Sequence, residues 1–315
     1  MEACYSPEQF NVSSYGATSV AIITFEAFAG MWINAFIVSV ICMSWFRKKT
    51  LNSNEKILLV VGCSRFCFLC FSWVYSFLSI IYPNYFYVPP TYTLIVSIQS
   101  IFECSNLWFS ACLCVFYCIK IANFRNSFFI YLKVKVDRMV PWLLLGSVFF
   151  SLVIGILICD LTNKQHCNNS TGQGNFSEVS IRTEEHFSPT FFIYGFEFIT
   201  SFMAFIFSAL LLLFSLWRHK RNMQSNSMKD LSMDAHIKAM KSILSFFVTY
   251  SINFACLIFN MVYATEEESP VKFLNYVLLY SFTVIHSLIL IISNPKLEKP
   301  MLRILACVKC KVCMR

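Results

Sequence analysis

The chain alternates between long apolar runs and short polar segments that are often basic. An apolar run of about 20 residues is long enough to cross the hydrocarbon core of a bilayer as a helix. None of the runs shows the period-two alternation of a barrel strand, so each is predicted to be a helix. Seven runs reach this length, near residues 18–46, 57–82, 93–120, 139–160, 187–217, 237–264 and 271–293.

This pattern predicts an all-α membrane protein whose single domain is a seven-transmembrane helix bundle over residues 18–293. A short polar segment, residues 1–17, precedes the bundle, and a tail, residues 294–315, follows it. With 57% hydrophobic residues in 315, the composition excludes an ordinary soluble domain. No basic region of a signal peptide precedes the first run, so the first helix is predicted to serve as its own insertion signal.

One polar seam runs along the third predicted helix, over six side chains spaced by three or four residues. This spacing places side chains on one face of a helix. The six are Gln99, Glu103, Asn106, Ser110, Cys114 and Tyr117. Because a carboxylate in the hydrocarbon region must face a bundle interior or a wet cavity, Glu103 predicts a central helix that lines a binding cavity. The alternative is a buried neutral carboxyl group that hydrogen-bonds to Asn106 or Gln99.

Three further charged groups lie within predicted spans. Glu197 lies two to three turns from the outer end of the fifth span, and we predict that it converges with Glu103 on the cavity. The alternative for Glu197 is a position that faces lipid headgroups, and Glu26 of the first span is predicted to be peripheral. Arg65 of the second span is predicted to find polar partners on the first, third or seventh helix.

The distribution of basic residues predicts the orientation. Of the 25 Lys and Arg residues, 21 lie in or beside the loops 47–56, 121–138 and 218–236 or in the tail 294–315. Because Lys and Arg accumulate on the cytoplasmic side, the N-terminus is predicted outside and the C-terminus inside. The net charge of +8 therefore reflects topology and contact with anionic lipid, and no nucleic-acid partner is predicted.

The polar segment 161–186 is predicted to be an outer loop. It carries three N-x-S/T sequons on the side assigned outside, so N-glycosylation is predicted at one or more of Asn168, Asn169 and Asn175.

Most of the 15 cysteines lie within the apolar runs, where cysteine behaves as a small apolar residue. A bridge between Cys4 and Cys167 on the outer side stays open as an alternative to two free thiols. In the tail, Cys307, Cys310 and Cys313 have C-x-x-C-x-x-C spacing, but three thiols without a fourth ligand do not make a metal site. Beside basic residues next to the membrane they are candidates for palmitoylation.

Several segments of the predicted inner half resemble the type 2 (bitter) taste receptor family. They are Ser64-Arg65 with Trp73, the WFSACL segment 108–113, the KIANF segment 120–124, the AHIKAMK segment 235–241, and the HS pair 286–287 followed by NPKL at 294–297. The Asp-Arg-Tyr and Asn-Pro-x-x-Tyr motifs of rhodopsin-like receptors are absent from the sequence. No nucleophile stands beside a base, so no enzyme, catalytic residue or cofactor is predicted.

The resemblance implies a G-protein-coupled receptor that binds small bitter agonists in a cavity in the outer half of the bundle. Its predicted ligand-binding residues are Gln99, Ser100, Glu103, Asn106, Glu197, Tyr276 and Leu279. The family commonly has asparagine at the position of Glu103. The carboxylate here indicates a site for a cationic or strongly donating ligand.

The resemblance also implies a plasma-membrane receptor that activates a heterotrimeric G protein of the gustducin or Gi type. The residues predicted for activation and coupling are Arg65, Tyr117, Lys120, His236, Lys241, Tyr250 and His286. Two alternatives remain. One is a vomeronasal-type pheromone receptor. The other is a transporter or channel, since intramembrane acids also mark ion paths, although the sequence has no internal repeat.

Overall fold

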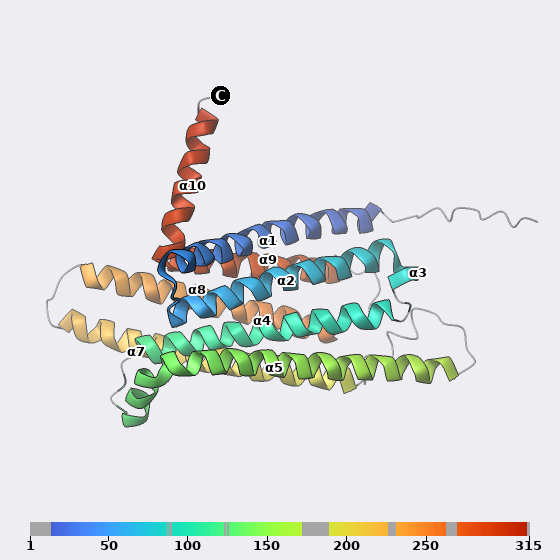
Figure 1. Cartoon of the computed structure of the whole chain (residues 1–315), viewed down its shortest axis with the longest axis horizontal. Helices are drawn as coiled ribbons and strands as arrows, with labels where there is room; N and C mark the ends of the chain where they lie inside the picture. The colour runs from blue at the N-terminus through green and yellow to red at the C-terminus, as the bar shows by residue number, and fades with distance from the viewer. Residues whose placement is uncertain are drawn as a thin grey trace, which may run out of the picture.

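A computed structural model describes residues 14–86, 88, 90–122, 124, 126–171, 189–225, 231–262 and 270–313, and every regular element in these ranges is a helix. Long helices lie side by side along the longest axis of the molecule (Figure 1). They are α1 (Ser14–Lys48), α2 (Ser53–Ile81), α4 (Thr91–Ile121), α5 (Ser127–Thr171), α7 (Pro189–Ser225), α8 (Leu231–Val262) and α9 (Pro270–Ser293). Two other helices are the short α3 (Pro83–Phe86) and α10 (Pro295–Cys313).

Each predicted span falls on one of the long helices, which confirms the helix-bundle prediction. Within the described residues, α1, α2, α4, α5 and α7 are long and apolar enough to cross a membrane by themselves. The apolar part of α9, Val277–Ser293, meets this test only together with α10, and the two are bent by 101°. In α8 the apolar part is shorter, Ile243–Phe259.

The two ends of the bundle are distinct. At the α10 end, α10 turns away from the bundle axis, and α1 connects to α2 (Figure 1). At the opposite α3 end, α3 connects α2 to α4. The α10 end carries the basic loops and is the end that the charge distribution predicts to be cytoplasmic.

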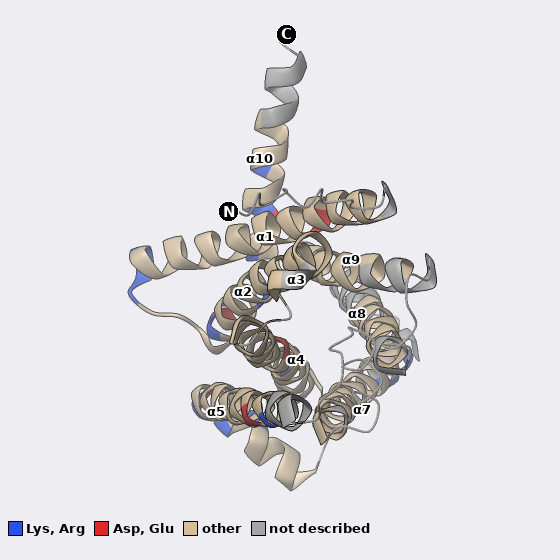
Figure 2. Ribbon diagram, turned by 90° about the vertical axis from the view of Figure 1, so that its right-hand side faces the viewer, with Lys and Arg blue, Asp and Glu red and all other residues tan. Residues whose placement is uncertain are grey.

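Seen end-on, the long helices form a ring, and α4 lies between α2 and α5 (Figure 2). It packs against α2, α5 and α7, so the prediction that this helix is central is confirmed. None of the six side chains of its polar seam is exposed. The seam therefore faces other helices along its whole length.

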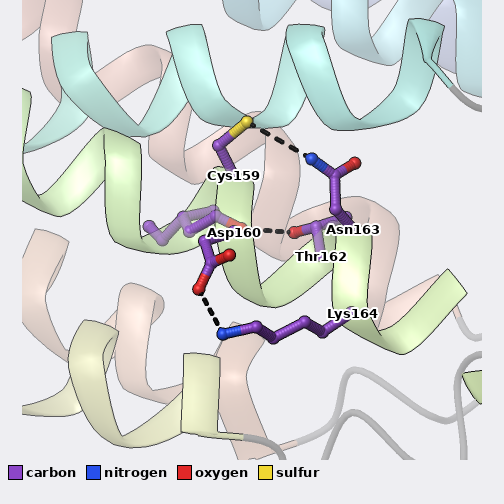
Figure 3. A network of polar contacts seen from close by, with 6 residues as sticks. Cys159, Asp160, Thr162, Asn163 and Lys164 are labelled. Atoms are coloured by element: carbon purple, nitrogen blue, oxygen red, sulfur yellow. Dashed lines mark hydrogen bonds and ion pairs between the residues drawn. The ribbon is translucent and has the colours of Figure 1, made fainter. Parts of the chain in front are cut away.

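The helix α5 continues past the predicted end of the fourth span, and its last turns replace the first part of the outer loop predicted over 161–186. Contacts between residues four apart support this polar extension (Figure 3). Lys164 pairs with Asp160 at 2.6 Å, and Asn163 donates to the sulfur of Cys159 at 3.8 Å. Hydropathy locates the apolar part of a helix, whereas backbone hydrogen bonds carry the helix into the polar segment beyond it.

The inner loop predicted over 218–236 is shorter than predicted, since α7 ends at Ser225 and α8 begins at Leu231. Here too the helices continue past their apolar parts into polar residues. Most of the predicted tail also has a regular structure, α10.

A glycine lets α5 approach α4 closely. A Cβ atom added to Gly155 would lie 2.6 Å from Cδ1 of Ile101 and 3.3 Å from the carbonyl oxygen of Ser97. A Cβ atom added to Gly146, on the same helix, would meet no atom within 4 Å.

We expect Gly155→Val to lower the free energy of unfolding of the detergent-purified protein by about 1–3 kcal/mol, because the added side chain forces α4 and α5 apart. The matched control is Gly146→Val. It changes the helix propensity of α5 by the same amount, but its side chain meets no neighbouring atom. Thermal unfolding measures both, and equal midpoints for the two variants would contradict the close packing.

Candidate functional site

The guanidinium group of Arg65 lies inside the bundle and is 1% exposed. Its Nε donates to Oδ1 of Asn106 at 3.1 Å, and Nη1 donates to Oγ of Ser287 at 3.2 Å. Its Nη2 donates to Oγ of Ser110 at 3.1 Å and contacts Nδ1 of His286. The prediction that Arg65 finds polar partners on the third and seventh helices, α4 and α9, is confirmed.

The first helix joins this group through Ser287. The Ser287 hydroxyl lies 3.0 Å from Oδ1 of Asn34, whose Nδ2 donates to the carbonyl of Gly30 at 2.8 Å. We call Arg65, Asn34, Asn106, Ser110, His286 and Ser287 the arginine cluster. The arginine cluster connects α1, α2, α4 and α9.

A cavity of about 20 Å³ lies beside the arginine cluster, toward the α10 end. Its lining residues are Ser110, Leu113, Cys114, Tyr117, Phe205, Ala209, Leu212, Ile243, Phe246 and His286. Tyr117 and His286 belong to the set predicted for activation. The residues predicted to bind the agonist do not line this cavity.

A second group of polar residues lies between α4 and α7, nearer the α3 end. Glu197 is 1% exposed, and neither carboxylate oxygen has a hydrogen bond to a described N–H or O–H group. Its neighbours on α4 are Cys104 and the carboxyl group of Glu103. The alternative that Glu197 faces lipid headgroups is therefore wrong. Glu103 and Glu197 lie near each other, and that they line a binding cavity stays a prediction.

Two hydroxyl groups join α4 to α7 beside these acids. The hydroxyl of Ser100 donates to the carbonyl of Val96 at 2.7 Å and also contacts the hydroxyl of Tyr194. Gln99 is half-buried, and its Oε1 has no hydrogen bond within the described part of the chain. We call Gln99, Ser100, Glu103, Tyr194 and Glu197 the acid group.

The other predicted ligand residues lie apart from the acid group or outside the described residues. The amide oxygen of Asn106 accepts from Arg65, which places Asn106 in the arginine cluster. Leu279 is half-buried and packs against the hydrophobic core. The side chain of Tyr276 lies outside the described residues.

At the α10 end, α4 makes two polar contacts through residues predicted for coupling. The hydroxyl of Tyr117 donates to Oδ1 of Asn54 on α2 at 3.1 Å. Nζ of Lys120 pairs with Oδ2 of Asp137 on α5 at 2.6 Å, and both side chains are exposed.

Aromatic contacts connect α7, α8 and α9 near the arginine cluster. The ring of Tyr250 is buried and stacks on Phe205 of α7 at 3.9 Å between centroids. The ring of Phe246 meets the His286 ring edge-on at 4.8 Å. The side chains of His236 and Lys241, on the first turns of α8, lie outside the described residues.

Most of the predicted modification sites cannot be placed from the described side chains. Cys307 is exposed on α10. The side chains of the other predicted sites lie outside the described part of the chain. They are Asn168, Asn169, Asn175, Cys310, Cys313, Cys4 and Cys167.

Asn34 shares a face with Gly30 on the first span and is predicted to offer an amide to another helix, which its contact with Ser287 confirms. Sequence reasoning missed Tyr194, whose partner Ser100 lies 94 residues away in the chain. One signal was present, because Tyr194 precedes Glu197 by three residues and so shares a helix face with it.

The family model for the taste receptor protein (TAS2R) matches residues 12–309 of the chain. The chain belongs to this family. Taste receptor type 2 member 7 of Macaca mulatta is 30% identical over 288 residues, which cover 89% of this chain and 90% of that protein. Type 2 member 2 of Homo sapiens is 29% identical over 296 residues, with 93% and 97% covered, and type 2 member 9 of Papio hamadryas is 28% identical over 311 residues, with 94% and 96% covered.

Membership in the TAS2R family makes the chain a seven-helix G-protein-coupled receptor of the bitter taste class and a multi-pass membrane protein. The predicted family and receptor function are confirmed, and the vomeronasal and transporter alternatives are not supported. Two segments that carried the resemblance, Ser64-Arg65 and His286-Ser287, supply the centre of the arginine cluster.

We expect Ser287→Ala to lower the free energy of unfolding of this TAS2R protein by about 1.5–3 kcal/mol, the range for a hydrogen bond to a charged group. Ser208→Ala is the control, because the buried Ser208 hydroxyl donates, among the described groups, to a carbonyl of its own helix, that of Ala204, at 2.8 Å. Thermal unfolding in detergent compares the two. A loss no larger in Ser287→Ala than in Ser208→Ala would show that Arg65 does not need this partner.

Proposed function

We propose that this taste receptor binds small, mostly apolar bitter agonists that carry an amine, in the acid group between α4 and α7. The observation that supports this proposal is the carboxylate of Glu197, which is buried, lies beside Glu103, and has no hydrogen bond to a described N–H or O–H group. Among the described side chains its one donor is the thiol of Cys104, which is weak, so the buried carboxylate keeps a large desolvation cost that a cationic ligand would remove.

The chemistry of the acid group favours a ligand that donates hydrogen bonds. Glu103, Glu197 and the amide oxygen of Gln99 all present acceptors. The described side chains around Glu197 include no Lys, Arg or His paired with it. An ammonium group placed between the two carboxylates would satisfy both, and the surrounding apolar side chains would cover the rest of the agonist.

We place the G-protein site at the α10 end, which the basic loops predict to be cytoplasmic. Agonist would shift the balance between two arrangements of the inner helix ends, by as much as its affinities for them differ. The contacts that would change are those of the arginine cluster and the rings of Tyr250 and Phe246 that connect it to α7 and α8. The partner in this proposal is a G protein of the gustducin or Gi type at the plasma membrane.

We expect Glu103→Gln and Glu197→Gln each to raise the half-maximal concentration of amine agonists about 10- to 100-fold, because each loses a charged hydrogen bond worth about 1.5–3 kcal/mol. Agonists without an amine would shift much less. Calcium release in cells that also express a taste-type G-protein chimera measures the response, and surface labelling corrects for expression.

Glu26→Gln is the matched control, because Glu26 is a third acid of the bundle but accepts a hydrogen bond from Ser281 at 2.6 Å between α1 and α9. If all three variants respond to amines as wild type does, the acids are structural and the agonist binds elsewhere. If wild type responds only to agonists without an amine, the receptor proposal stands and the choice of ligand class is wrong.

The proposed orientation predicts that the segment between α5 and α7 is outside the cell and carries N-linked glycan. We expect wild type from mammalian cells to lose apparent mass on treatment with an N-glycosidase. The combined variant Asn168→Gln, Asn169→Gln, Asn175→Gln should run below untreated wild type, and adding Asn11→Gln removes the remaining outer sequon. If the glycosidase does not change the mass of wild type, the predicted glycosylation is wrong. The proposed orientation then loses this support.

A further inference from the structure

We propose that, without agonist, the carboxyl groups of Glu103 and Glu197 hold one proton between them, and that an amine agonist displaces this proton. The inference rests on the proposed function and concerns the regulation of the same site. The acid group would bind either a proton or an ammonium group, so an acidic solution outside the cell would weaken the response to amines.

The first argument is the burial of Glu197 between α4 and α7. Its side chain is 1% exposed, and neither carboxylate oxygen accepts from a described N–H or O–H group. The thiol of Cys104 donates to this carboxylate, but a thiol is a weak donor and brings no positive charge. A negative charge held at this place without a counter-charge is costly.

The second argument is the neighbouring acid. Glu103 lies near enough to Glu197 for two negative charges to repel one another. When two carboxyl groups share a buried site, the ionisation of one opposes the ionisation of the other. Oε1 of Gln99, which has no hydrogen bond within the described residues, is a further acceptor. The acid group therefore has acceptors in excess and needs a cation.

The third argument is that the helices packed around the two acids supply no base among their described side chains. The thiol of Cys104 comes from α4, the phenol of Tyr250 from α8, and the hydroxyl of Ser151, beside Cys104, from α5. These groups are neutral at physiological pH. On α2, Arg65 is bound within the arginine cluster, and no described ion pair joins it to either acid.

The cation that fits the pair without agonist is a proton. A metal ion requires several ligands, and the described residues include no group of three or more His, Cys, Asp or Glu side chains that could hold one. A proton needs one oxygen to bind it and a second to accept its hydrogen bond. Two neighbouring carboxyl groups provide both.

Agonist binding then exchanges one cation for another. The O–H bond of the protonated acid breaks, the proton passes to the solution at the α3 end, and the ammonium group takes its place between two carboxylates. The pair and its bound cation carry one negative charge before and after the exchange. Because the buried charge does not grow, the exchange avoids the cost of a second unpaired carboxylate.

The first test uses no agonist. Infrared spectra of the full-length receptor, purified in detergent at neutral pH, should show the carbonyl band of a protonated carboxylic acid. The double variant Glu103→Gln, Glu197→Gln should lose this band. The matched control Glu26→Gln, in an acid held by Ser281 between α1 and α9, should keep the band that the double variant loses.

If wild type lacks this band, or if the double variant retains all of it, the two acids do not hold the proton and the proposal is wrong. Wild type alone can give the first of these results, so the test does not depend on the folding of the double variant. Because no agonist is present, this failure is distinct from a failure of the proposed function.

The second test is the response of wild type to an aralkyl primary amine, whose ammonium group stays charged over the range used, so that only the site titrates. As the external pH falls from about 8 to about 6, we expect its half-maximal concentration to rise by up to about tenfold per unit, because each bound agonist releases one proton. Glu26→Gln should show the same dependence, and an agonist without an amine should show none.

A response to the amine that does not change with pH would show that agonist does not displace the proton, and would overturn the proposal. If no amine activates wild type, the proposed function fails and the displacement fails with it. The infrared band still decides in that case whether the two acids hold a proton.

Discussion

The fold depends on accommodating one guanidinium group inside a membrane-spanning bundle. Arg65 cannot reach water, so its donors must be met by side chains, and the apolar layer around it supplies few. Its partners come from α4 and α9, and Ser287 brings in Asn34 of α1. A change in the position of any of these helices would leave a buried charge with an unsatisfied donor. The arginine cluster therefore fixes the relative positions of four helices.

The charged groups of the interior are kept apart rather than paired. Arg65 lies between α2, α4 and α9, whereas Glu103 and Glu197 lie between α4 and α7. Had these charges met, they would have neutralised one another and produced a structural ion pair. Because they do not, no described Lys, Arg or His forms an ion pair with the acid group. The proposed binding of a cationic agonist depends on this separation.

Helix α4 carries both sites and connects them. Asn106, a partner of Arg65, lies one turn from Glu103 on the same helix face. The acid group and the arginine cluster therefore share one helix and lie one turn apart on it. The rings of Tyr250 and Phe246 extend the contact to α7 and α8. This gives a continuous physical route between the acid group and the α10 end.

The sequence by itself determined the helices, the inward polar seam of α4 and the family, because apolar length and three-to-four spacing are local properties of the chain. It did not determine where helices end, since α5 and α7 continue through polar residues beyond their apolar parts. Only the tertiary structure decided that Asn106 pairs with Arg65, that Ser287 is the partner of Asn34, and that Tyr194 takes part. Those outcomes depend on how each helix rotates and packs against helices distant in sequence, and no spacing within one segment encodes that rotation.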